Sequence, residues 1–272
     1  MLAVQANGAI IPILGLGTWD LHGRTCARIV EQALRLGYRH VDTAQAYDNE
    51  REVGEGIRGS GLAREQVFVT TKIWWTNLAA GALEHAVAES LARLKLGYVD
   101  LLLVHWPNAA VPLSETITAL CRMKREGLAR HVGVSNFTVA LIEEAVALST
   151  EPIVNNQIEM HPYLDQTRVV EACRRRGVSV TAYCPIARGA ATGDDVLARI
   201  GRVHDKTAAQ VSLRYLVQQG IIAIPRTSRV ERLSENFEIF DFELTGEEMA
   251  AIRALARPGG RTVDPSWAPV WD

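Results

Sequence analysis

The sequence is short of lysine, of closely spaced cysteines and of long apolar runs, and each shortage excludes a class of protein. Lysine supplies only four of the 29 basic residues, and 29 Lys+Arg against 31 Asp+Glu leave a formal net charge of −2. No basic field is available to hold a nucleic acid backbone or an anionic membrane surface. Apolar runs such as residues 101–104 and 221–224 fall far below the ~20 residues that a membrane helix needs.

The cysteines are too far apart for a disulfide framework or a zinc site. They form no CxxC pair and stand at Cys26, Cys121, Cys173 and Cys184. This usage predicts reduced thiols in a cytoplasmic protein without a metal. The apolar N-terminal segment lacks a basic start and contains Asn7-Gly8, a strong hairpin signal, so we expect a β-hairpin there instead of a signal peptide.

Short apolar runs with the length of buried strands recur along the chain. Eight of them predict strands at 13–17, 39–43, 67–72, 99–105, 130–135, 153–159, 178–183 and 221–225. Runs such as LLLVH lack polar alternation, which is typical of parallel strands that are covered on both faces.

Amphipathic stretches separate these runs, and several end at a glycine, as helix C-termini prefer. They predict helices near 24–36, 48–59, 79–95, 114–126, 138–148, 167–176, 207–219 and 230–240. An eightfold strand–helix alternation over 272 residues without a linker favours one (β/α)8 barrel domain over residues 1–272. A doubly wound sheet is the alternative.

In such a barrel the C-terminal ends of the strands meet at one mouth, where barrel enzymes carry their chemistry. Asp42, Lys72 and His105 end successive predicted strands, and Tyr47 follows the first of them. In a chain that otherwise uses arginine, a strand-end lysine suggests that its compact ammonium matters. A stabilising ion pair with Asp42 is the alternative for Lys72, and a satisfied core position is the alternative for His105.

These four side chains together can act as an acid. A tyrosine hydroxyl with a reference pKa near ~10 is a weak donor at neutral pH. We expect the Lys72 ammonium to lower the pKa of Tyr47, while Asp42 keeps Lys72 charged and His105 orients a substrate oxygen. Such a site suits protonation of a carbonyl oxygen during hydride transfer to its carbon.

Other motifs give no support for competing chemistry. Residues 54–59 match G-x-G-x-x-G but end a helical stretch and precede a strand, whereas a dinucleotide fingerprint follows a strand and opens a helix. No Walker A lysine motif, GxSxG elbow or HExxH occurs.

The sequence resembles the aldo-keto reductase family. The matching motifs are LGLGTW, GYRHVDTAQAYDNEREVG, TTKIW, YVDLLLVHWP, HVGVSNF, NNQIEMHPY, TAYCPIARG and IPRTSRVERLSENFEIFDFEL. The resemblance implies Tyr47 as proton donor, Asp42 and Lys72 as its tuning pair, and His105 as substrate orienter. It also implies NADPH bound in extended form at the barrel mouth without a Rossmann motif.

The resemblance assigns further residues to the cofactor. Ser135, Asn136 and Gln157 are expected to hold the nicotinamide carboxamide, and Tyr183 to stack on the ring. Arg226, Thr227 and Arg232 are expected at the 2′-phosphate, which favours NADPH over NADH although many members have lysine in place of Arg226. The remaining expected cofactor neighbours are Gly17, Thr18, Asp42, Cys184, Glu235 and Asn236.

The tryptophans outline the expected substrate pocket. Trp19, Trp74 and Trp106 stand at strand ends and predict the walls of an apolar pocket around the carbonyl, with plugging of the mouth as the alternative. Short connections and the closing APVWD are most similar to the short bacterial 2,5-diketo-D-gluconate reductase B group, which also reduces methylglyoxal. The resemblance implies a monomer acting on small aldehydes or ketones.

Two other functions stay open from the residues alone. A barrel aldolase would use Lys72 as a Schiff-base lysine, but it leaves Tyr47 and the Arg226–Arg232 pair unexplained. The second is a non-enzymatic NADPH-sensing regulatory subunit of the same fold, against which stand the intact tetrad and the absence of an added interaction domain.

Overall fold

The computed structural model describes residues 2–272 and begins with the predicted hairpin. Strands β1 (Ala3–Ala6) and β2 (Ala9–Pro12) pair in antiparallel register. Asn7 and Gly8 join them with φ of 45° and 90°. Two successive positive φ angles are what a two-residue type I′ turn needs, which explains the Asn-Gly pair.

Eight parallel strands form the second sheet and confirm all eight strand predictions. In chain order they are β3 (Leu16–Gly17), β4 (His40–Asp42), β5 (Phe68–Ile73), β6 (Val99–Val104), β7 (Ala129–Ser135), β8 (Ile153–Glu159), β9 (Ser179–Tyr183) and β10 (Ile222–Ala223). Each strand pairs with its sequence neighbour.

The first and last strands also meet, so the sheet is closed. Leu14 forms a parallel bridge with Ala223, and the Gly15 amide donates to the Ala223 carbonyl at 2.9 Å. Gly17 donates to the Pro225 carbonyl at 3.1 Å. The fold is therefore a (β/α)8 barrel, and the alternative of an open doubly wound sheet is wrong, since an open sheet leaves its edge strands unpaired.

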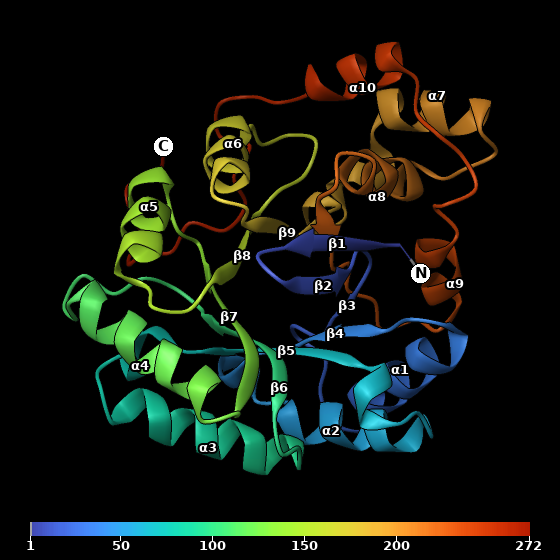
Figure 1. Ribbon diagram of the computed structural model, residues 1–272. Coiled ribbons are helices and arrows are strands. Elements are labelled where there is room, and N and C mark those ends of the chain that lie inside the picture. Colours follow the sequence, from blue (N-terminus) through green and yellow to red (C-terminus); the bar gives the residue numbers. More distant parts are fainter. Residues whose placement is uncertain (1) are drawn as a thin grey trace.

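Helices surround the curled sheet (Figure 1). The predicted ones are α1 (Gly23–Leu36), α2 (Glu50–Gly59), α3 (Ala82–Leu94), α4 (Leu113–Arg125), α5 (Val139–Leu148), α6 (Thr167–Arg175), α8 (Ala208–Val217) and α9 (Glu231–Phe237). Short 3-10 helices lie at Gln45–Tyr47, Arg64–Gln66, Trp75–Asn77 and Ala187–Gly193. No helix within residues 2–272 is both long and apolar enough to cross a membrane.

Two helices, α7 (Asp195–Val203) and α10 (Gly246–Arg253), were not predicted because they lie outside the strand–helix alternation. Both helices nevertheless begin after a residue type that favours helix N-caps. Asp194 accepts hydrogen bonds from the amides of Val196 and Leu197, and Thr245 forms a capping box with Glu248. A search for capping residues would have found both starts.

The hairpin covers one end of the barrel, over which it lies in Figure 1. Ile11 of β2 packs in one apolar cluster with Leu101 and Leu103 of β6 and with Ile222 of β10. This cluster is separate from the larger core between the sheet and the helices. It closes the barrel at the N-terminal ends of the strands and leaves the opposite mouth for polar residues.

Candidate active site

Asp42 and Lys72 form a buried ion pair at the C-terminal ends of β4 and β5. Lys72 is 0% exposed, and its Nζ lies 2.5 Å from Asp42 Oδ1. The same ammonium donates to the Thr43 carbonyl at 2.8 Å. Burial lowers the pKa of Lys72, while the carboxylate of Asp42 acts in the opposite direction. The pair satisfies both charges, as a buried ion pair must.

Tyr47 ends the 3-10 helix Gln45–Tyr47 and reaches this pair. Lys72 Nζ donates to the Tyr47 hydroxyl at 3.4 Å and lies 4.9 Å from the centre of its ring. We expected the Lys72 ammonium to lower the pKa of Tyr47, but the net effect of the surroundings of Tyr47 is to raise it. Desolvation in the barrel mouth and the negative charge of Asp42 raise this pKa well above its ordinary value. Tyr47 therefore carries its proton at neutral pH.

His105 follows β6, and its ring faces that of Tyr47, which follows β4. Their ring centres are 5.6 Å apart at 77°, and Trp74 packs edge-on against His105 at 5.1 Å. Burial and the nearby Lys72 charge hold the pKa of His105 well below its usual range. The imidazole is neutral, and its buried Nδ1 has no hydrogen-bond partner among the described residues. One buried ring nitrogen is thus left without a protein partner.

The residues assigned to the nicotinamide form one hydrogen-bonded chain beside this group. Gln157 Nε2 donates to Asp42 Oδ2 at 2.7 Å, and Ser135 Oγ donates to the Gln157 carbonyl at 2.7 Å. Asn136 donates to the His105 carbonyl at 2.9 Å and accepts a hydrogen bond from the Tyr183 hydroxyl at 2.7 Å. The expected tetrad and the expected nicotinamide residues therefore meet at one place.

The other expected cofactor residues are spread around the mouth. Gly17 packs closely against the backbone, since a Cβ there would lie 2.7 Å from the Ile224 carbonyl oxygen. The Thr18 hydroxyl donates a hydrogen bond to the Asp42 carbonyl at 2.9 Å. Glu235 accepts a hydrogen bond from the Thr207 hydroxyl at the start of α8. The positions of the rest follow: Thr227 and Asn236 are buried, Cys184 is half-buried, and Arg226 and Arg232 are exposed.

Aromatic side chains line the mouth, and two of them come from the C-terminal tail, the segment that follows α10. Trp267 stacks on Trp75 at 5.7 Å and packs edge-on against Trp74 at 6.1 Å. Trp271 meets Trp106 at 6.1 Å. The sequence analysis placed only Trp19, Trp74 and Trp106 in the pocket, because nothing in the spacing of Trp267 and Trp271 shows that the tail folds back onto the strand ends.

Trp19 behaves differently from the other two tryptophans predicted to wall the pocket. Its side chain is 50% exposed, and the Arg188 guanidinium lies over its ring at 5.5 Å. Its carbonyl accepts a hydrogen bond from Arg226. Trp19 therefore contacts two arginines at the edge of the mouth.

Glu159 at the end of β8 fixes the tail, a role that sequence analysis missed. Its buried carboxylate accepts hydrogen bonds from the amide and hydroxyl of Thr262, from the Val263 amide and from His161. Burial acts to raise the pKa of Glu159, but the hydrogen bonds from His161 and Thr262 prevail and lower it. The sequence did contain a signal for this role, because Glu159 is a charged residue at the end of a predicted strand, within the motif NNQIEMHPY.

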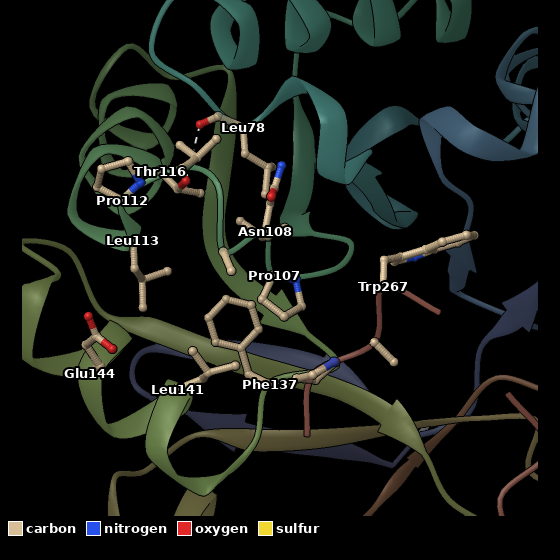
Figure 2. Close-up of a pocket in the computed structure, with 15 residues that line it drawn as sticks. Leu78, Pro107, Asn108, Pro112, Leu113, Thr116, Phe137, Leu141, Glu144 and Trp267 are labelled. Atoms are coloured by element: carbon tan, nitrogen blue, oxygen red, sulfur yellow. Dashed lines mark hydrogen bonds between the residues drawn. The ribbon is translucent and has the colours of Figure 1, made fainter. Parts of the chain in front are cut away.

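A groove of about 430 Å³ is lined in part by residues of the tail, among them Trp267. Figure 2 shows Phe137 and Pro107 beside it, with Leu113 and Leu141 on one side and Trp267 on the other. Its walls are mainly apolar and come from the loop after β6, from α4 and α5 and from the tail. None of the four tetrad residues lines it, but Trp267, which packs against Trp74, lies in its wall.

Comparison with known proteins agrees with this geometry. The model of the aldo/keto reductase family matches residues 13–257, which is most of the chain. The chain belongs to the aldo/keto reductase family. Its membership places the chain among the oxidoreductases and supports carbonyl reduction. The Salmonella typhimurium methylglyoxal reductase DkgB is 43% identical over 266 residues, which cover 96% of this chain and 99% of the relative.

Solved aldo/keto reductase structures share the whole fold. One, provisionally assigned as a 2,5-diketo-D-gluconic acid reductase B, is 53% identical with a TM-score of 0.98, covering 100% of this chain and 98% of its own. The Bombyx mori aldo-keto reductase, solved in complex with NADP, is 35% identical with a TM-score of 0.90 over 97% of this chain and 95% of its own.

Proposed function

We propose that the protein reduces small aldehydes or ketones to alcohols with NADPH, and that Tyr47 supplies the proton. The hydrogen-bonded group Tyr47–Lys72–Asp42, beside the neutral imidazole of His105 at the barrel mouth, carries this proposal. The proposed substrate classes are methylglyoxal, on the similarity to DkgB, diketo-gluconate-like sugars, on the similarity to the 2,5-diketo-D-gluconic acid reductase B structure, and aromatic aldehydes, on the aromatic lining of the mouth.

Each member of the tetrad has a separate task. Neutral His105 donates its N–H to the carbonyl oxygen and orients it, and the Tyr47 hydroxyl gives its proton to the same oxygen as negative charge develops there. Lys72 stabilises the resulting Tyr47 phenolate, whose formation its buried charge favours. Asp42 keeps the ammonium charged and in place. Solvent then returns a proton to Tyr47.

The donor groups at the mouth fit a dinucleotide at both of its ends. The amides of Asn136 and Gln157 lie with Tyr183 beside the tetrad, where they suit a carboxamide-bearing ring. Arg226 and Arg232 are exposed on the segment after β10, where their guanidinium groups suit a phosphate. When bound, the nicotinamide would supply the hydride for the carbonyl carbon. The NADP complex of the Bombyx mori relative supports this choice of cofactor.

The Schiff-base aldolase is disfavoured by the same geometry. A Schiff-base lysine needs a neutral amine that a carbonyl carbon can reach, whereas the Lys72 ammonium is fully buried and paired with Asp42. Borohydride reduction with a carbonyl substrate would leave a stable adduct on Lys72 if the aldolase were correct. The intact tetrad likewise speaks against a purely NADPH-sensing subunit.

The decisive measurement is NADPH oxidation with methylglyoxal, a diketo-gluconate and an aromatic aldehyde. Tyr47→Phe removes the donated proton, so we expect kcat to fall by about 100- to 10,000-fold, the usual contribution of a general acid. Tyr98→Phe is the matched control, because its buried hydroxyl has no partner among the described residues and lies outside the site. Full activity of Tyr47→Phe would disprove the proton-donor role.

A further inference from the structure

Arg226, which we assign to the cofactor 2′-phosphate, is engaged by the loop after β3. Its Nη2 donates to the Asp20 carbonyl at 2.7 Å and lies 3.2 Å from the Asp20 carboxylate. Its Nε donates to the Trp19 carbonyl at 3.2 Å. A phosphate needs the same N–H groups, since a guanidinium binds it most strongly through two parallel hydrogen bonds. Phosphate and loop therefore compete for one side chain.

The Asp20 carboxylate adds an electrostatic term to this competition. It is an anion within hydrogen-bond distance of the guanidinium, so it neutralises the charge that a phosphate would meet and repels the phosphate itself. His22 is a second partner of Asp20, at 3.7 Å. Asp20 has a φ of 57°, a left-handed conformation that aspartate and asparagine tolerate better than most residues.

The loop after β3 also contacts a second arginine, through the ring of Trp19. Arg188, in the segment after β9, lies over the Trp19 ring at 5.5 Å. Trp19 thus contacts both Arg188 and Arg226, whereas Asp20 contacts only Arg226 of these two arginines.

We infer that Asp20 is a specificity-determining residue that competes with the 2′-phosphate for Arg226 and so reduces the preference for NADPH over NADH. This inference rests on the proposed function, because it requires NADPH to bind at the mouth. Asp20 acts only on a ligand that carries the 2′-phosphate. Its removal should therefore change the affinity for NADPH and leave that for NADH unaltered.

Calorimetric titration of the substrate-free protein tests this inference without an activity measurement. Asp20→Asn removes the charge and keeps a residue suited to the left-handed backbone. We expect its affinity for NADPH to rise by about 2- to 5-fold, the range of an exposed ion pair, with no change for NADH. Added salt should shrink the difference, because the groups are exposed.

A double-mutant cycle with Arg226→Ala shows whether Asp20 acts through that arginine. In the Arg226→Ala protein the Asp20→Asn change should have no effect on NADPH affinity. Asp205→Asn is the matched control, since Asp205 is also exposed with a φ of 55° and has no ion pair within residues 2–272.

Four results would overturn the inference. Equal changes for NADPH and NADH, or none for either, would refute it and leave the proposed function intact. An undiminished effect of Asp20→Asn in Arg226→Ala would show that Asp20 acts without Arg226. A wild-type protein that binds neither dinucleotide would refute the proposed function, and this inference with it.

Discussion

The ammonium of Lys72 is fully buried and is surrounded by oxygen atoms of Asp42, Thr43 and Tyr47. An isolated buried charge would be very costly, so its position depends on these partners. Residue types at three strand ends predicted the tetrad. The pKa of Tyr47 could not be predicted, because burial of the hydroxyl and its approach to Asp42 are properties of the packed mouth.

Arg232 gives a prediction at the same scale for the cofactor end of the site. Arg232→Ala should weaken NADPH binding by about 10- to 150-fold, the loss of one hydrogen bond between charged groups, and should leave NADH binding almost unaffected. Steady-state KM values for both dinucleotides check this. Arg202→Ala removes an equally exposed arginine from α7 and serves as the control. An equal effect of Arg232→Ala on both cofactors would disprove the phosphate assignment.

Helix α2 contains residues 54–59, the G-x-G-x-x-G match that is not a dinucleotide-binding loop. Gly54 and Gly56 lie inside this helix. A Cβ on Gly56 would lie 2.5 Å from the Ala27 carbonyl oxygen and 2.6 Å from Val30 Cβ of α1. A Cβ on Gly54 would clash with the Leu94 carbonyl. These glycines permit close helix packing, and their spacing reflects which face of α2 meets its neighbours.

Gly56→Ala should destabilise the protein because its methyl group meets backbone. We expect the free energy of unfolding to fall by about 1–3 kcal/mol, the usual cost of overpacking, despite the better helix propensity of alanine. Urea denaturation measures this change. Gly246→Ala in α10 is the matched control, since its Cβ would meet nothing within 4 Å, and it should be neutral or stabilising. Unaltered stability of Gly56→Ala would contradict the packing argument.

For the whole molecule, buried neutral histidines make stability depend on pH. Burial lowers the pKa of His40, and burial with the charge of Lys72 lowers that of His105. Both groups bind a proton more readily in the unfolded chain, where the pKa is about 6.5. Their contribution to stability is therefore present above this value and is lost as the pH falls below it, toward their folded-state pKa values.

The unfolding free energy should consequently decrease between pH 7.5 and pH 5.5. Each histidine that stays neutral in the folded protein adds a slope of up to about 1.4 kcal/mol per pH unit. Urea denaturation across this range measures the slope. Glu159 should add a separate loss at lower pH, because hydrogen bonds to its carboxylate depress its folded-state pKa. Constant stability from pH 7.5 to 5.5 would contradict neutral burial of His40 and His105.

Local patterns along the chain determined the hairpin, the eight strands and the alternating helices. Asn7-Gly8 dictates its turn, and apolar runs with glycine-terminated helices dictate the barrel order, because these signals depend on neighbouring residues alone. The positions of Asp42, Lys72 and His105 at strand ends follow from the same periodicity, since parallel strands deliver their ends to one mouth.

Only the tertiary structure decided the contacts between segments far apart in the sequence. The tail returns to Glu159 and brings Trp267 to Trp74, and Arg226 meets Asp20 across more than 200 residues. No periodicity encodes such meetings, because they depend on how closure of the barrel places loops from different strands. The sequence thus placed the chemistry at the mouth, while folding determined which charges and rings surround it.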